Sequence, residues 1–226
     1  FLALQIVVPR QLQAYYPIWW KNLSQKKRNE IPPCLIGLLH HFIVVPCALY
    51  FIIRYHSSGV LMTHAQVALV GPFSFAYLTL DTIFYAFQEA RIGNFEYIIH
   101  HILAVWVTIA LTNGKQPLVV SFVPDILACE LSTIFFAIGW ILRNTSYKNM
   151  NIIKSLEICF AITFFFTRII NLPIGVLRMW PVSEELGLAR YPLIPIVAMQ
   201  FFWFYKIIIS VLKSTKPIPI SAKEKV

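Results

Sequence analysis

The chain has 226 residues, of which 58% are hydrophobic, 15% aromatic and only 13% charged, and its mean hydropathy is +0.68. A soluble domain carries about 25% charged residues, so this composition excludes a globule covered by polar surface and predicts an integral membrane protein. The net charge is +9, but no nucleic-acid-binding motif accompanies it. We therefore expect no nucleic-acid partner, and interpret the basic residues as contacts to anionic lipid headgroups.

Residues 1–33 are predicted to form an amphipathic, basic segment in front of the membrane domain. The opening stretch FLALQIVVP is apolar but stops at Pro9. About nine residues at 1.5 Å each cannot cross a hydrocarbon core of about 30 Å. We interpret this stretch either as part of a further helix or as a segment that lies on the membrane surface.

Six apolar runs of spanning length follow. They cover roughly residues 34–53, 66–87, 95–113, 117–142, 152–176 and 192–212. The runs are longer than barrel strands and lack strict alternation, and backbone polar groups in lipid must be satisfied within the segment. The sequence therefore predicts an all-α polytopic bundle of six transmembrane helices over residues 34–213, followed by a basic tail over residues 214–226.

The Lys and Arg residues are distributed unevenly around these runs. Six crossings place both chain ends on one side, and most of the 19 basic residues fall on that side. The other side receives only Arg54, Lys115, Arg178 and Arg190. Because cytosolic loops carry the excess of Lys and Arg, both ends are predicted to face the cytosol or its equivalent.

Ionisable residues inside the apolar runs are the strongest functional signal, since an unpaired protonatable side chain at membrane depth costs a few kcal/mol or more. One group lies about five to seven residues from the predicted cytosolic end of its run, a depth of roughly 8 to 10 Å. It comprises His40, His41, Asp81, His100, His101, Glu157 and Lys206. Asp125 and Arg168 share a deeper layer, and Glu130 lies between the two.

The adjacent His100 and His101 carry the functional interpretation. Neighbours on a helix point about 100° apart, so one is expected to face a cavity while the other supports it. The pair is interpreted as a general base or nucleophile acting on a lipid, against the alternative of packing histidines that are merely hydrogen-bonded. Asp81 is placed to orient the active imidazole and fix its tautomer, or else makes a simple hydrogen bond. His41 is expected to act only together with the third helix.

The remaining buried charges receive structural interpretations. Asp125 and Arg168 are expected to form a structural ion pair rather than a catalytic couple. Glu130 is the most isolated carboxylate, which predicts that it is protonated or faces water. Lys206 is expected to reach the membrane interface with its long side chain.

The motifs of several other chemistries are missing. The six histidines form no HxxHH-type box, and no GxSxG, HExxH, Walker or GxGxxG motif occurs. The four cysteines have no CxxC spacing, which favours free thiols. We therefore expect no metal site and no bound cofactor.

Six segments follow one another in an order that is typical of one family. They are LLHHFIVVPCALY, AYLTLDTIFYAF, YIIHHILAV, CELSTIFFAIGWILR, ITFFFTRIINLP and MQFFWFYKIIISVLK. Together they resemble the TLC domain over about residues 35 to 213, a domain shared by translocating-chain-associated proteins, ceramide synthases and the neuronal ceroid lipofuscinosis membrane protein. The resemblance implies an endoplasmic reticulum protein that acts on or handles membrane lipids. A mitochondrial inner membrane would satisfy the same charge bias.

The chain departs from ceramide synthases in the fourth run. Those enzymes carry a second histidine–aspartate pair and a further aspartate there, whereas this chain has Val123-Pro124-Asp125 and then Glu130. The chain therefore looks closer to the small TLC-domain-containing branch.

Two classes of function stay open. In the first, a lipid acyltransferase uses acyl-CoA as co-substrate and an amine or alcohol lipid as acceptor, with His100 and His101 at the polar end of a tunnel and Asp81 orienting the imidazole. The candidate substrate-binding residues are His41, Asp125, Glu130, Arg168 and Trp203. In the second, a non-catalytic membrane component serves lipid sensing, transport or trafficking, or is an accessory subunit with membrane-protein partners or a second copy of itself. The missing second histidine favours this class.

Overall fold

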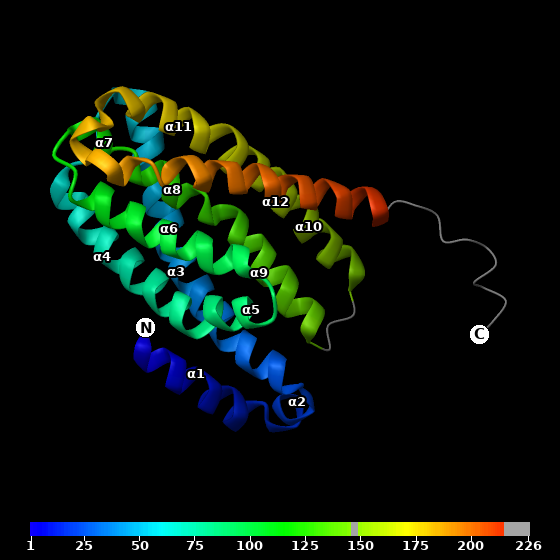
Figure 1. The fold of residues 1–226 in the computed structure, drawn as a ribbon. Helices are drawn as coiled ribbons and strands as arrows, with labels where there is room; N and C mark the ends of the chain where they lie inside the picture. The colour runs from blue at the N-terminus through cyan, green and yellow to red at the C-terminus, as the bar shows by residue number, and fades with distance from the viewer. Residues whose placement is uncertain (146–148, 215–226) are drawn as a thin grey trace.

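The computed structural model describes residues 1–145 and 149–214, and within these ranges the regular structure is helical throughout (Figure 1). Six stretches are long and apolar enough to cross a membrane: Gln25–Ser58, His64–Arg91, Phe95–Thr112, Pro117–Asn144, Met150–Arg190 and Leu193–Val211. The predicted fold class, an all-α bundle of six membrane-spanning helices, is confirmed. The predicted tail over residues 214–226 lies outside the described residues apart from Ser214.

Three of the spans are single α-helices and three are composite. The single ones are α3 (Gln25–Ser58), α6 (Phe95–Thr112) and α12 (Leu193–Ser214). The second span joins α4 (His64–Asp81), the π-helix η1 (Thr82–Ala86) and α5 (Phe87–Arg91). The fourth joins α7 (Pro117–Val120), α8 (Val123–Ala128) and α9 (Glu130–Asn144). The fifth joins α10 (Met150–Phe164), the π-helix η2 (Phe165–Asn171), α11 (Leu172–Met179) and the 3₁₀ segment η3 (Trp180–Arg190).

The first span begins earlier than hydropathy predicts, at Gln25 instead of residue 34. Ser24 sets this start, because its hydroxyl accepts a hydrogen bond from the Lys27 backbone N–H at 3.3 Å. Gly59, with φ at +68°, ends the helix in the left-handed conformation that glycine adopts without strain. The charged stretch QKKRNE is helical but too polar for a hydropathy pass to include.

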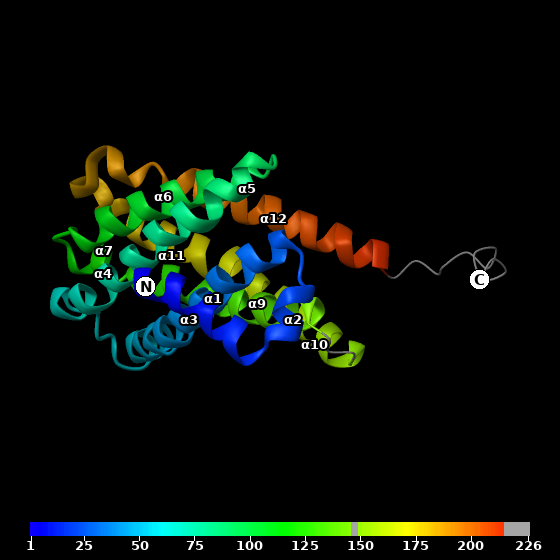
Figure 2. The ribbon, with the colours of Figure 1, turned by 90° about the horizontal axis from the view of Figure 1, so that it is seen from below.

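The N-terminal segment packs against the bundle. Helix α1 (Leu2–Tyr15), which contains Pro9, and the short α2 (Pro17–Asn22) lie beside α3, and Figure 2 shows α1 and α3 side by side from below. The Phe1 ring lies 4.9 Å from the Phe73 ring of α4, centroid to centroid. Residues 25–33, predicted to belong to this segment, are part of α3 instead.

The apolar core lies among α3, α4, α6 and the fourth span, where Val44, Val119 and Phe122 are almost wholly buried. Gly175 of α11 admits the Phe122 ring, since a Cβ there would lie 2.5 Å from the ring. Large apolar side chains such as Leu69 (77% exposed) point outward, as expected of helices surrounded by lipid. Helix α12 extends past its neighbours toward its C-terminal end in both views (Figures 1 and 2).

Candidate functional site

A cavity of about 380 Å³ lies inside the bundle and is lined by residues of all six spans. Its polar lining comprises Glu30, His41, Tyr77, Asp81, Tyr85, Tyr97, His100, His101, Glu130, Ser132, Thr133, Arg168 and Lys206. Aromatic side chains make much of the rest, namely Phe136, Trp140, Phe160, Phe164 and Trp203. A mostly apolar cavity with a few converging polar groups is typical of a small-molecule site.

The predicted polar layer is only partly assembled around this cavity. His41, Asp81, His100, His101 and Lys206 all line it, although His41 lies about 24 Å along α3 because that helix starts so early. Glu157 is not part of the layer. It pairs with Arg143 on the outside of the bundle, where half of its side chain is exposed.

Asp81 and His101 form the closest polar contact in the cavity. His101 Nε2 lies 2.7 Å from Asp81 Oδ2, and His101 Nδ1 lies 2.8 Å from the Tyr97 carbonyl oxygen. Nδ1 must donate its proton, because a carbonyl only accepts. The Nε2–Oδ2 contact then shares one proton between imidazole and carboxylate. Both nitrogens of His101 are therefore occupied, which suits a positioning role better than attack on a substrate.

His100 is the imidazole that remains available. Its Nδ1 is buried without a hydrogen-bond partner, and no described residue hydrogen-bonds to either ring nitrogen. The ring is held by aromatic contacts, edge-on to Trp203 at 4.9 Å and to His101 at 5.6 Å between centroids. The sequence predicts that one histidine of the pair faces a cavity while the other supports it. Both line this cavity, and they differ instead in their partners, because only the ring nitrogens of His100 have no hydrogen bond to a described residue.

The two histidines of α3 form a second polar group. His40 is buried, with Nε2 3.1 Å from Ser74 Oγ and its ring stacked on Tyr77 at 4.1 Å. His41 Nδ1 lies 3.3 Å from His40 Nδ1 and 3.4 Å from Glu130 Oε2. The expectation that Glu130 is isolated is therefore wrong. Its partner comes from another helix, which spacing along one run cannot reveal.

Arg168 joins three spans at the deep end of the cavity. Its Nε donates to the Cys129 carbonyl at 3.1 Å and to Ser132 Oγ at 3.0 Å, and the two terminal nitrogens donate to Gln200 Oε1 and Thr133 Oγ1, each at 3.0 Å. The Cys129 carbonyl accepts this bond where the fourth span breaks between α8 and α9. Arg168 also lies 3.8 Å from Glu130.

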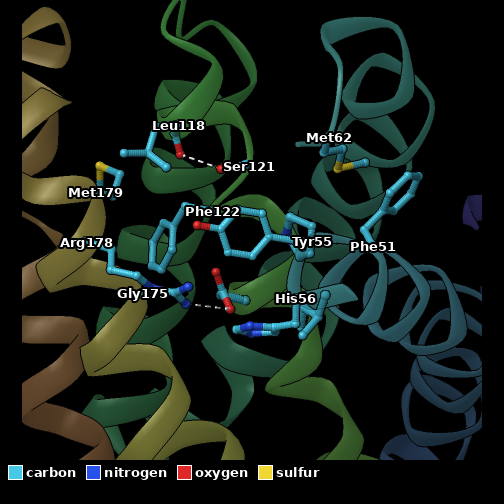
Figure 3. A pocket seen from close by; sticks show the side chains of 13 residues that line it. Phe51, Tyr55, His56, Met62, Leu118, Ser121, Phe122, Gly175, Arg178 and Met179 are labelled. Atoms are coloured by element: carbon cyan, nitrogen blue, oxygen red, sulfur yellow. Dashed lines mark hydrogen bonds and ion pairs between the residues drawn. The ribbon is translucent and has the colours of Figure 1, made fainter. Parts of the chain in front are cut away.

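The predicted Asp125–Arg168 ion pair is wrong. Asp125 lies 3.8 Å from Arg178, and both line a separate hollow of about 30 Å³ near the end of α3. Figure 3 shows this hollow from close by, with Arg178 labelled. Tyr55 and His56 of α3 also line this hollow. Asp125 and Arg168 share a depth but face different neighbours, so Asp125 is the one candidate substrate-binding residue that does not line the large cavity.

The cavity is also lined by polar side chains other than Asp81 and the histidines. Lys206 donates to Glu96 Oε1 at 2.8 Å and so links α12 to α6, with half of its side chain exposed. Tyr77 and Tyr97 lie four residues before Asp81 and His101, and that spacing could have placed them on the same helix faces. Among the described residues, no group of three or more His, Cys, Asp or Glu side chains could hold a metal ion.

Cys34 provides a test of cavity access. It lines the cavity, whereas Cys129 is buried, with Sγ 3.5 Å from the carbonyl oxygens of Asp125 and Thr167. In variants that keep only one cysteine, we expect N-ethylmaleimide to modify Cys34 and to leave Cys129 unmodified, as measured by intact mass. Palmitoyl-CoA should slow the labelling of Cys34. Equal labelling of the two thiols would contradict this cavity.

The family model described as the TLC domain matches residues 30–209, which include almost the whole of the six-span bundle and every residue that lines the large cavity. Comparisons with curated proteins and with solved structures gave no match. The matched region is most of the chain and contains the His100–His101 pair, the Asp81 carboxylate and Arg168. The chain therefore belongs to the TLC domain family.

Proposed function

We propose that this protein is a lipid acyltransferase of the endoplasmic reticulum that moves an acyl group from acyl-CoA to an acceptor lipid. The observation that carries the proposal is the unpaired His100 imidazole at an intramembrane cavity, beside a histidine whose nitrogens are both engaged. Burying a histidine without hydrogen-bond partners inside the membrane costs free energy. Its retention facing an aromatic-lined cavity suits a group that reacts with a ligand.

In the first step, a ring nitrogen of His100 attacks the thioester carbonyl carbon. The N–C bond forms, the C–S bond breaks, and the CoA thiolate leaves and takes up the proton that the other ring nitrogen loses. His101 acts by position, because its ring lies edge-on to His100 and is fixed by Asp81 and by the Tyr97 carbonyl. Trp203 fixes the other side of the His100 ring.

The cavity suits the two parts of an acyl-CoA. Phe136, Phe160 and Phe164 offer an apolar wall for the acyl chain. Lys26 and Lys27 lie in the first turn of α3, at the end of the bundle where Lys206 lines the cavity, and their charge would attract the phosphates of CoA. This arrangement fits the proposed orientation, in which both chain ends face the cytosol, where acyl-CoA is found.

The decisive experiment uses the full chain in phospholipid vesicles with radiolabelled palmitoyl-CoA. Octadecanol and octadecylamine serve as acceptors with the same chain and different headgroups. We expect release of free CoA thiol, label in an octadecyl product, and a transient palmitoyl adduct on the peptide that contains His100, found by acid quench and mass spectrometry. Absence of CoA release with both acceptors would contradict the proposal. His56→Ala, at the far end of the bundle, is the matched control.

A second function is favoured by a specific observation. His40, His101 and Arg168 are all engaged in hydrogen bonds that link helices, as structural groups would be. A non-catalytic lipid-binding protein, working in lipid sensing or trafficking or as a subunit of a larger membrane assembly, would need the same cavity without chemistry at His100. Palmitoyl lipids that co-purify unchanged with the protein, together with no CoA release, would support it.

A further inference from the structure

The cavity holds a second histidine–carboxylate pair, built from a different pair of helices than Asp81 and His101. His41 of α3 lies against Glu130, the first residue of α9, with 3.4 Å between Nδ1 and Oε2. Both residues line the cavity that contains His100. The first step of the proposed reaction does not use this pair, so it needs an explanation of its own.

The contacts around His41 fix which nitrogen carries the proton. One proton lies between the Nδ1 atoms of His40 and His41, which are 3.3 Å apart, and the Glu130 carboxylate 3.4 Å from His41 Nδ1 favours that proton on His41. His40 Nδ1 then accepts a hydrogen bond from the His41 Nδ1–H group, and the His40 Nε2–H group donates to Ser74 Oγ. His41 Nε2 is left with its lone pair and has no hydrogen-bond partner among the described residues. This is the tautomer of a general base that is oriented by a carboxylate.

The Tyr77 hydroxyl oxygen and the free His41 Nε2 both lie close to Gly37. A Cβ on Gly37 would lie 2.8 Å from the Tyr77 hydroxyl oxygen and 3.5 Å from His41 Nε2. Glycine at this position therefore leaves space beside both groups, on the cavity wall. No described residue hydrogen-bonds to the Tyr77 hydroxyl, which can donate to or accept from a ligand.

The charges of the cavity indicate the headgroup that would bind there. Every cavity carboxylate already has a partner within 4 Å, since Asp81 pairs with His101, Glu130 with His41 and Arg168, and Glu30 with Lys26 at 3.5 Å. None therefore lacks a positively charged or donor partner that the ammonium group of a ligand would otherwise supply. A neutral hydroxyl, in contrast, can donate to His41 Nε2 and accept from Tyr77 without disturbing these pairs.

We propose that His41 is the base for the second half of the reaction and that the acceptor is a lipid alcohol. The inference rests on the proposed acyltransferase function. The acceptor oxygen attacks the acyl carbon on His100, and its proton moves to His41 Nε2. The new O–C bond forms as the N–C bond breaks, and the electron pair returns to His100. His41 then gives up the acceptor's proton, which restores the N–H of His100 and leaves both imidazoles neutral. Glu130 positions His41, and Tyr77 holds the acceptor hydroxyl.

The test separates the two half-reactions in His41→Gln, which keeps a polar side chain. With palmitoyl-CoA and octadecanol, we expect a normal burst of one CoA per protein and a stable palmitoyl adduct on His100. Turnover should fall at least about 100-fold, the usual contribution of a general base. Glu130→Gln should also keep a normal CoA burst and lose turnover, but the loss of turnover should be smaller. A merely structural role of either residue would reduce burst and turnover together, and that result would overturn the assignment.

Two further variants keep the inference testable if His41→Gln does not fold. Tyr77→Phe should slow transfer to octadecanol about 10-fold with an unchanged burst, as for one lost hydrogen bond. Gly37→Ala should do the same by displacing the Tyr77 hydroxyl, whereas Gly139→Ala, whose Cβ would lie 3.6 Å from Leu156, should behave as wild type. Unchanged turnover in both Tyr77→Phe and Gly37→Ala would overturn the site.

The wild-type protein tests the acceptor class and separates the two proposals. Octadecanol should be acylated faster than octadecylamine, and the reverse preference would overturn the lipid-alcohol assignment. A wild-type protein that shows no CoA burst refutes the acyltransferase function and this inference with it. A normal burst with wild-type turnover in His41→Gln refutes the inference alone.

Discussion

His100→Ala is expected to abolish palmitoyl transfer, with a loss of about 10³-fold or more in turnover and no acyl adduct. The reason is that the variant lacks the one imidazole of the pair whose nitrogens are free to form a bond with the acyl carbon. Turnover and CoA burst are measured on the same vesicle preparation, with His56→Ala as the matched control. If His100→Ala keeps the burst of CoA release, another residue must be the nucleophile, and the mechanism would be contradicted.

His101→Gln should behave differently from His100→Ala, because His101 acts through the orientation of its neighbour. We expect adduct formation to persist but to slow by about 10²-fold. Asp81→Asn should have a similar effect, since it removes the carboxylate 2.7 Å from His101 Nε2. Identical and complete losses in all three variants would instead indicate that the pair works as one unit, and the division of roles drawn here would be wrong.

Arg168→Met is expected to have the largest effect on stability. Its guanidinium makes hydrogen bonds to α9 and α12 from the π-helix η2, and it lies near the Glu130 carboxylate. Interhelical hydrogen bonds in membrane proteins are worth about 0.6 kcal/mol each on average. Loss of a buried ionic partner adds more, so the cost approaches the 3 to 5 kcal/mol typical of breaking a buried pair. For a chain of this size, that lowers the midpoint of thermal unfolding by roughly 10 °C.

The matched control for Arg168→Met is Arg178→Met. Arg178 faces Asp125 in the small hollow, but 35% of its side chain is exposed, so its loss should cost much less. The unfolding midpoint of each variant is measured in the same detergent by the amount of monodisperse protein left after heating. A smaller shift for Arg168→Met than for Arg178→Met would refute the structural role given to the Arg168 network.

The sequence by itself determined the number of spans, the helical fold class and the family. These follow from run length, hydropathy and the order of short motifs, which are properties of the chain read in one dimension. The same reading placed His100 and His101 five to six residues into α6, because α6 starts where its apolar run starts. It misplaced the start of the first span, since the Ser24 cap extends α3 through a charged turn that hydropathy leaves out.

Only the tertiary structure decided which buried groups meet. Counting residues gives the depth of a side chain, but the direction in which it points depends on the rotation of its helix and on the neighbours packed around it. Asp125 and Arg168 share a depth and yet find different partners, Arg178 for one and the Cys129 carbonyl for the other. Glu130 meets His41 across nearly ninety residues of sequence for the same reason. The cavity and its two histidine–carboxylate pairs exist because six helices close around one space, and no single helix carries that information.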